Sequence, residues 1–243
     1  NYFAIQRVTK IDQRPDEILN KYNVIVTSTN SAGQESNEYI IVEVKDVNDF
    51  DINKITRTIS STNQVYFGTS SNYKFYNLGE DRYALKTDSG YDEITGVTSL
   101  QFSDKTLNLE KDIAGTFDQI TGLNTPSGEM FRLYNAAFAR FPDASGLEYW
   151  IDKFSSGVDD ERAVASSFIE SPEFAERYGA NVSNAKYVET LYVNVLGRDY
   201  DQDGYNYWLG NLNNGTETKY ELLLGFAESA ENKTLFTEMT GLG

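Results

Sequence analysis

The second half of the sequence repeats itself, and this repeat constrains the fold more than any other feature. A shift of 58 residues aligns residues 133–173 with residues 191–231 without a gap. Twelve of the 41 aligned pairs are identical: Leu133/Leu191, Tyr134/Tyr192, Arg140/Arg198, Asp143/Asp201, Gly146/Gly204, Tyr149/Tyr207, Trp150/Trp208, Gly157/Gly215, Phe168/Phe226, Glu170/Glu228, Ser171/Ser229 and Glu173/Glu231. Because apolar and turn-forming residues recur together, the sequence predicts two copies of one helical unit, at about 130–177 and 188–236.

Apolar residues in this half of the chain recur every three to four positions, as they do on one face of an α-helix. The first such segment places five side chains together, namely Met130, Leu133, Tyr134, Ala137 and Phe138, and Ser127 is its expected N-cap. Further helices are predicted over residues 147–154, 161–170, 172–179, 184–196, 205–212, 219–228 and 230–239. Residues 123–243 are therefore expected to form a duplicated all-helical domain.

The first half of the chain has the pattern of β-strands. Residues 1–50 contain β-branched runs on either side of a polar turn, which predicts the last hairpin of a β-sandwich. A whole sandwich has about seven strands, so this one is partial, and a partner is expected to complete it unless the chain starts in mid-domain. Residues 51–122 form short runs punctuated by glycine, which indicates a small β-rich module. The expected fold class is multi-domain, β plus all-α.

Composition removes several kinds of chemistry. The chain contains no cysteine and no histidine, which excludes thiol nucleophiles, zinc-thiolate sites and histidine general bases. A formal net charge of −16 disfavours nucleic acid and anionic membrane surfaces as partners. No stretch approaches the ~20 apolar residues that a membrane span requires. Catalytic residues, a nucleic-acid partner and membrane insertion are therefore not expected.

An acidic turn in the second copy resembles the start of a calcium loop. Asp199, Asp201 and Asp203 alternate and Gly204 follows, as in loops that surround calcium with oxygen ligands. The twelfth loop position, where a bidentate glutamate is usual, is Gly210. Two interpretations remain open, a weak calcium site formed by the three aspartates or a solvated acidic turn that caps a helix.

The first copy of this turn favours a structural role for the shared residues. It keeps the central aspartate and the glycine but has Phe141 in place of Asp199. A shared aspartate just before a helix accepts hydrogen bonds from the first backbone N–H groups, which is typically worth ~1 kcal/mol. The residues expected to build this structure are Asp143, Gly146, Trp150, Gly204 and Trp208, with the two tryptophans anchoring the core.

Three segments resemble known families. The pattern R-x-x-D-x-x-G-x-x-Y-W with a later F-x-E-S occurs in both copies and resembles bacterial domain-of-unknown-function family 4214, which is frequent in secreted surface proteins. Residues 73–109 are similar to a small β module found in bacterial type I secretion substrates. Residues 22–49 look like the end of a cadherin-like or immunoglobulin-like repeat. In cadherins the terminal D-x-N-D motif, here Asp46, Asn48 and Asp49, binds calcium, although the interior acidic motif has Asn30 in place of aspartate.

These resemblances imply a non-enzymatic extracellular segment of a bacterial surface layer, adhesin or appendage, exported by a type I system. Calcium is the implied cofactor, and the implied partners are other copies of the chain, other surface proteins and glycans. Two alternatives follow from the residues. Exposed tyrosine or tryptophan platforms would favour a carbohydrate-binding module. Two carboxylates facing each other in a cleft would favour a carboxylate-only glycoside hydrolase with the helical repeats as an accessory.

Overall fold

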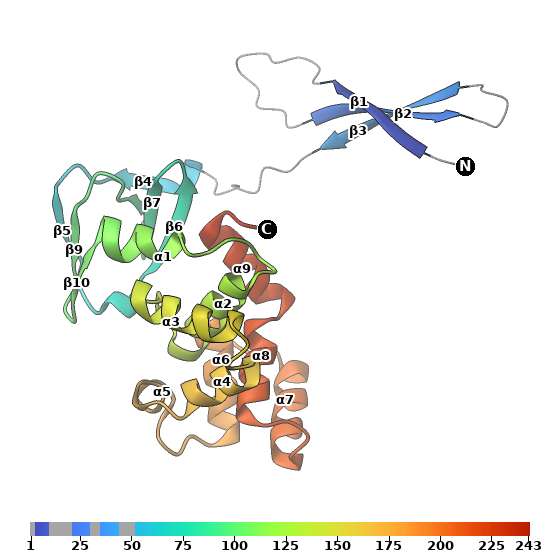
Figure 1. Ribbon diagram of the computed structural model, residues 1–243. Coiled ribbons are helices and arrows are strands. Elements are labelled where there is room, and N and C mark those ends of the chain that lie inside the picture. Colours follow the sequence, from blue (N-terminus) through green and yellow to red (C-terminus); the bar gives the residue numbers. More distant parts are fainter. Residues whose placement is uncertain (1–2, 10–20, 30–34, 44–51) are drawn as a thin grey trace. The chain divides into compact units, whose positions relative to one another are not determined.

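The computed structural model describes residues 3–9, 21–29, 35–43 and 52–243 (Figure 1). The chain divides into two compact units, Asn1–Asp49 and Phe50–Gly243. Along the described residues the secondary structure follows the predicted order, since strands come first and α-helices follow from Gly115 onward. The predicted class, a β part followed by an all-helical part, is confirmed.

The first unit contains one antiparallel sheet with the strand order β1-β2-β3. Its strands are β1 (Phe3–Thr9), β2 (Lys21–Thr29) and β3 (Glu35–Glu43). The β2–β3 pairing runs without a shift from Lys21 opposite Glu43 to Thr29 opposite Glu35. Completion of this sheet by a partner strand stays a prediction.

The calcium residues expected in this first unit, Asp46, Asn48 and Asp49, lie outside the described residues, as does Asn30. Calcium binding by this motif therefore also stays a prediction.

The β part of the second unit consists of two small sheets, one with the order β4-β8-β7-β6 and one with the order β10-β9-β5. The strands are β4 (Ile55–Thr58), β5 (Asn63–Val65), β6 (Lys74–Gly79), β7 (Arg82–Thr87), β8 (Gly90–Glu93), β9 (Ser99–Gln101) and β10 (Thr106–Asn108). Short helical turns η1 (Ile52–Lys54) and η2 (Ser70–Asn72) accompany them, and η3 (Leu109–Ala114) and α1 (Gly115–Phe117) lead to the helices. The β6–β7 hairpin turns through Gly79, Glu80 and Asp81, which all have positive φ.

The helical part repeats the starts of its helices as well as its sequence. Its helices are α2 (Pro126–Phe138), α3 (Ala144–Ser155), α4 (Glu161–Ile169), α5 (Pro172–Tyr178), α6 (Asn184–Leu196), α7 (Gln202–Asn214), α8 (Lys219–Ala227) and α9 (Ala230–Thr240). Each helix from α2 to α5 has a counterpart that begins 58 residues later. The N-caps keep the same spacing, as Thr125/Ser183, Asp143/Asp201, Asp160/Thr218 and Ser171/Ser229.

The N-cap of α2 differs from the prediction. Thr125, not Ser127, caps this helix, with its side chain accepting a hydrogen bond from the Gly128 N–H. The reason is Pro126, which has no N–H to donate and therefore suits the first helical position. The Ser127 hydroxyl instead accepts a hydrogen bond of 2.9 Å from the Thr121 N–H, so it holds the connection that leads into the helix.

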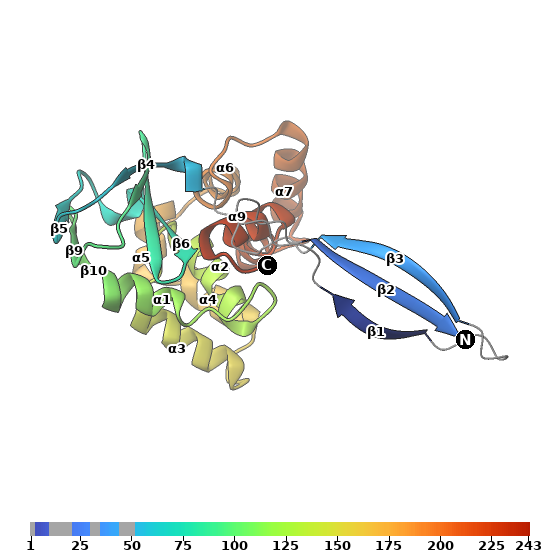
Figure 2. The same ribbon diagram turned by 90° about the horizontal axis from the view of Figure 1, so that it is seen from above.

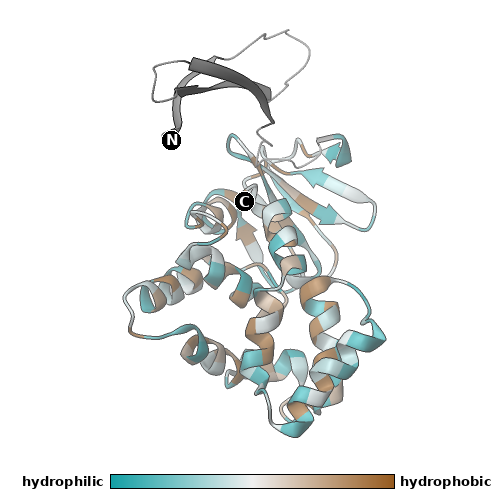
Figure 3. Cartoon of the chain, turned by 90° about the vertical axis from the view of Figure 1, so that its right-hand side faces the viewer, coloured by the Kyte–Doolittle hydropathy of each residue, from teal (hydrophilic) through white to brown (hydrophobic). Residues whose placement is uncertain are grey.

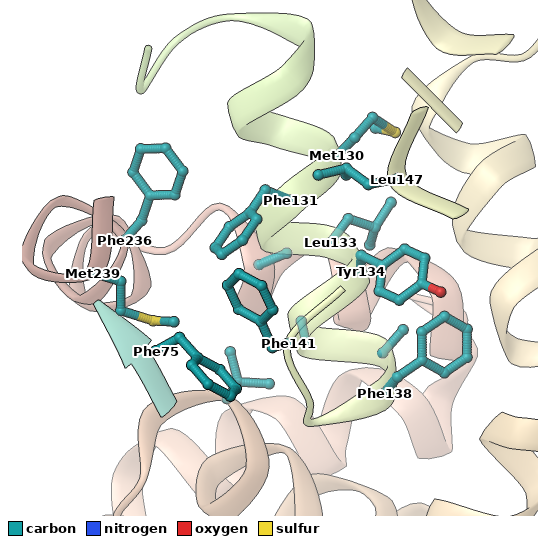
Figure 4. Close-up of a cluster of buried hydrophobic side chains, with 14 of the residues drawn as sticks. Phe75, Met130, Phe131, Leu133, Tyr134, Phe138, Phe141, Leu147, Phe236 and Met239 are labelled. Atoms are coloured by element: carbon teal, nitrogen blue, oxygen red, sulfur yellow. The ribbon is translucent and has the colours of Figure 1, made fainter. Parts of the chain in front are cut away.

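The strands and helices of the second unit share one core. The Phe141 ring lies 4.9 Å from Phe75 of β6 and 5.0 Å from Phe117 of α1. Phe131 of α2 lies 5.7 Å from Phe236 of α9, which packs against β6 (Figures 1, 2 and 4). The change from strands to helices after Asn108 is therefore not a break in the packing.

The helices around this core are amphipathic. Figure 3 shows brown, apolar stretches alternating with teal, hydrophilic stretches along them, which is the pattern of helices that bury one face. This pattern explains why the periodicity of the sequence located the helices.

Candidate functional site

The polar residues that the two copies share gather at two equivalent turns, one between α2 and α3 and one between α6 and α7. We call them the first clamp (Tyr134, Arg140, Asp143, Gly146 and Glu173) and the second clamp (Tyr192, Arg198, Asp201, Gly204 and Glu231). Each clamp ties the turn to the start of the last helix of its copy, α5 or α9.

Arg140 is the centre of the first clamp. Its guanidinium donates to both carboxylate oxygens of Glu173 and lies 2.9 Å from Asp143. It also stacks 5.1 Å above the Tyr134 ring, and its side chain is only 13% exposed. Burial opposes the guanidinium charge, but the hydrogen bonds to Glu173 and the nearby negative charges outweigh it and raise the pKa of Arg140. The first clamp thus centres on a largely buried arginine whose charge is paired with the more exposed carboxylates of Asp143 and Glu173.

Arg198 makes the same contacts in the second clamp, in a more open setting. It donates to the two oxygens of Glu231 at 2.7 and 2.8 Å and lies 5.1 Å above the Tyr192 ring. Its distance to Asp201 is 3.5 Å and its side chain is 41% exposed. Exposed pairs of this kind contribute less to stability than buried ones, because water screens them.

In each clamp the capping aspartate and the tyrosine hydroxyl leave no room for a Cβ at the glycine. Asp143 and Asp201 accept hydrogen bonds from the N–H groups of Gly146 and Gly204, at 3.1 and 2.8 Å. A Cβ on Gly146 would lie 2.2 Å from the Asp143 carboxylate, and a Cβ on Gly204 would lie 2.2 Å from the Tyr192 hydroxyl. The Gly204 N–H bond is also the main reason why the pKa of Asp201 is lowered.

The tryptophans of the two copies pack against equivalent phenylalanines. Trp150 meets Phe168 edge-on at 4.9 Å, and Trp208 lies 5.7 Å from Phe226. Both tryptophans are partly buried. They therefore hold α3 against α4 and α7 against α8.

The two turns differ where the sequence differs, and the structure gives the reason. Phe141 is 8% exposed and lies among the aromatic rings of the shared core, because the first turn faces the β part. Asp199 occupies the equivalent place in the second turn and is exposed. An aromatic residue suits the covered turn and an acid suits the solvated one.

The three acidic residues of the second turn differ in their surroundings. Asp199 and Asp203 are exposed, whereas Asp201 uses one carboxylate oxygen for Gly204 and the other for Arg198. Across the residues that the structure describes, no group of three acidic side chains converges as a metal site would require. A calcium ion at this turn would have to draw the aspartates together, and this site stays a prediction.

An ion pair that the sequence did not suggest joins the two copies. Arg132 of α2 is 1% exposed and donates to both carboxylate oxygens of Glu228, at 2.9 and 2.7 Å. It also donates to the Leu123 carbonyl oxygen at 2.7 Å and lies 5.1 Å from the Phe236 ring. We call this contact the latch. Its arginine has no equivalent in the second copy, where Thr190 takes that position.

A shallow hollow of about 1060 Å³ lies over the β part. Two of the charged residues that line it pair with each other, namely Arg57 and the buried Asp92. Asp92 also accepts a hydrogen bond of 2.9 Å from Tyr66. Lys74 and Lys86 also line it and face each other directly across β6 and β7. Burial, and then the charge of Lys86, lower the pKa of Lys74.

The shared tyrosines Tyr149 and Tyr207 belong to neither clamp and are 53% and 58% exposed. Each ring meets the neighbouring tryptophan edge-on, and the Lys153 ammonium lies over the Tyr149 ring. The sequence marked them as identical, but a tyrosine in a helical pattern is equally compatible with the core and with the surface.

Residues 165–236 match the model of a family described as "Domain of unknown function (DUF4214)". The match runs from α4 into α9 and includes the whole turn of the second clamp, so it supports the resemblance of the helical domain to that family. The chain has no match among the curated proteins or the solved structures. In the described parts of the chain no helix is both long enough and apolar enough to cross a membrane.

Proposed function

We propose that this chain is a non-enzymatic structural segment of a bacterial extracellular protein, such as a surface layer, an adhesin or an appendage. The observation that carries the proposal is the pair of clamps. In each clamp the arginine pairs with the aspartate and the glutamate of its own copy. The duplication therefore preserves side-chain contacts that stabilise the fold.

Three resemblances support the extracellular part of the proposal. The helical domain resembles family 4214, residues 73–109 resemble a β module of type I secretion substrates, and residues 22–49 resemble the end of a cadherin-like repeat. The proposed export route is therefore a type I system. The proposed partners are other copies of the chain or other surface proteins. The net charge of −16 favours partners that are not polyanions.

Labelling of intact cells tests this location. Antibodies raised against residues 53–243 are expected to label intact source cells or their medium, and protease added to intact cells is expected to remove the cell-bound signal. A cytosolic enzyme assayed in parallel shows that the cells stay closed. Label that appears only after lysis contradicts the proposal.

Calcium is expected to stabilise the second acidic turn modestly. At free calcium about ten times the dissociation constant, binding to the folded state raises the free energy of unfolding by about 1.4 kcal/mol. Thermal unfolding of the full chain with calcium and with a chelator measures this. The shift is expected to be lost in Asp199→Asn/Asp203→Asn, which keeps the Asp201 cap, and retained in the charge-matched control Asp152→Asn/Asp159→Asn. An equal calcium shift in both double variants contradicts this site.

A further inference from the structure

The exposed tyrosines of the two copies are preserved without a visible role in folding. Tyr149 meets the Trp150 ring edge-on at 5.0 Å, and Tyr207 meets the Trp208 ring in the same way at 4.8 Å. More than half of each tyrosine nevertheless faces solvent. Exposed aromatic groups that the fold does not use are a frequent sign of a binding surface.

The surroundings of the two tyrosines differ. In the first copy the Lys153 ammonium lies 5.7 Å from the centre of the Tyr149 ring and occupies one face of it. In the second copy the equivalent residue is Asn211, and in the described part of the chain no cation lies over the Tyr207 ring. Tyr207 therefore offers a free aromatic face that Tyr149 does not.

Beside Tyr207 the helix surface is bare. Gly210 lies one turn further along α7, on the same side of the helix, and a Cβ added there would meet no atom within 4 Å. Its φ is not in the left-handed region, so neither conformation nor packing requires glycine. A glycine inside a helix costs roughly 1 kcal/mol relative to alanine. A glycine at position 210 has a use if another molecule approaches the helix backbone closely at this point.

Polar side chains border this bare patch at both ends. Asp203 lies one turn before Tyr207 and Asn214 one turn after Gly210, and both are exposed. Their carboxylate and carboxamide groups accept and donate hydrogen bonds. The outer face of α7 thus combines an aromatic ring, open backbone and hydrogen-bonding groups. We call it the α7 face (Asp203, Tyr207, Gly210 and Asn214).

We propose that the α7 face binds a pyranose ring of a neutral polysaccharide. A pyranose with equatorial hydroxyls has a flat face of C–H groups, whose weakly positive hydrogens are attracted to the negative face of an aromatic ring. The sugar would lie on Tyr207 and over Gly210, with its hydroxyls bonded to Asp203 and Asn214. Asp203, which belongs to this face, and the net charge of −16 give the region a negative field, which disfavours acidic sugars. The inference does not depend on the proposed extracellular role.

Binding of named oligosaccharides to the full chain tests the inference. Calorimetry is expected to give a dissociation constant of about 1 mM, or about −4 kcal/mol, for at least one of cellopentaose, maltohexaose and chitohexaose. Trigalacturonate, an acidic sugar, is expected not to bind. Because Trp208 touches Tyr207, its fluorescence is expected to change with the same constant.

Variants distinguish specific binding at the α7 face from non-specific sugar binding elsewhere on the chain. Tyr207→Ala is expected to weaken binding at least tenfold, whereas Tyr207→Phe keeps the ring and the affinity. Gly210→Leu fills the bare patch with a better helix former and is expected to abolish binding while the chain stays folded. Tyr149→Ala is the matched control and is expected to bind as the native chain does. The inference is overturned if none of the three neutral sugars binds at about 5 mM, if Gly210→Leu binds normally, or if Tyr149→Ala weakens binding as much as Tyr207→Ala.

Discussion

Replacing Arg132 by alanine is expected to lower the free energy of unfolding by about 3–5 kcal/mol, because this removes one partner of a buried, hydrogen-bonded ion pair. The change breaks both bonds to Glu228 and leaves the Leu123 carbonyl oxygen without its donor. It also removes the guanidinium that packs on the Phe236 ring. Urea denaturation of the full chain, followed by the fluorescence of the two tryptophans, measures the loss.

A surface pair provides the control for this prediction. Arg162 lies 3.3 Å from Glu221, but its side chain is mostly exposed, so Arg162→Ala is expected to cost less than about 1 kcal/mol. Glu228→Gln keeps the size and one acceptor at the latch and is expected to cost less than Arg132→Ala. If Arg132→Ala costs no more than Arg162→Ala, the latch does not stabilise the helical domain.

Replacing Phe141 by alanine is expected to cost about 3–5 kcal/mol, the usual range for removing a buried phenylalanine. The ring contacts Phe75 of β6, Phe117 of α1 and Phe131 of α2, so its loss opens a cavity where strands and helices meet. Because this core is shared, the β part and the helices are expected to be weakened together. Hydrogen exchange of the full chain measures both, and β6 and α2 are expected to lose protection by the same free energy.

The second copy supplies the control for this replacement. Asp199 is the residue equivalent to Phe141, and its exposed side chain touches no core, so Asp199→Ala is expected to change stability by less than about 0.5 kcal/mol. Loss of protection in α2 but not in β6 after Phe141→Ala would contradict a shared core.

Local patterns carried most of the correct sequence predictions. The helices follow from three-to-four periodicity, and the Asp143 and Asp201 caps follow from an aspartate just before each periodic segment. The predicted α2 cap, Ser127, was wrong, because Pro126 moves the helix start two residues earlier than the apolar pattern suggests.

Contacts between distant residues were harder to predict. The repeat marked Glu173 and Glu231 as identical, but their arginine partners lie 33 residues away in sequence, and no periodicity connects them. The latch left no signal at all, since Arg132 and Glu228 are 96 residues apart and only the glutamate recurs in both copies. Pairing at such distances is decided by how the helices pack, which the sequence pattern alone does not reveal.

The candidate binding surface shows the same limit. The sequence presented Gly210 only as a missing calcium ligand and Tyr207 only as half of an identical pair. Their importance comes from what surrounds them, a free ring face and a bare stretch of helix. Exposure and empty space are properties of the folded chain, so they became visible only in three dimensions.

The latch also limits the number of repeat units that one helical domain can contain. In an open solenoid each unit touches only its neighbours, so genes can gain or lose units without disturbing the rest. Here Arg132, near the start of the first unit, binds Glu228, near the end of the second. A third unit inserted between them would move the glutamate away and leave a buried arginine uncompensated. The helical domain is thus a closed pair, and a longer array would have to be built by linking whole pairs.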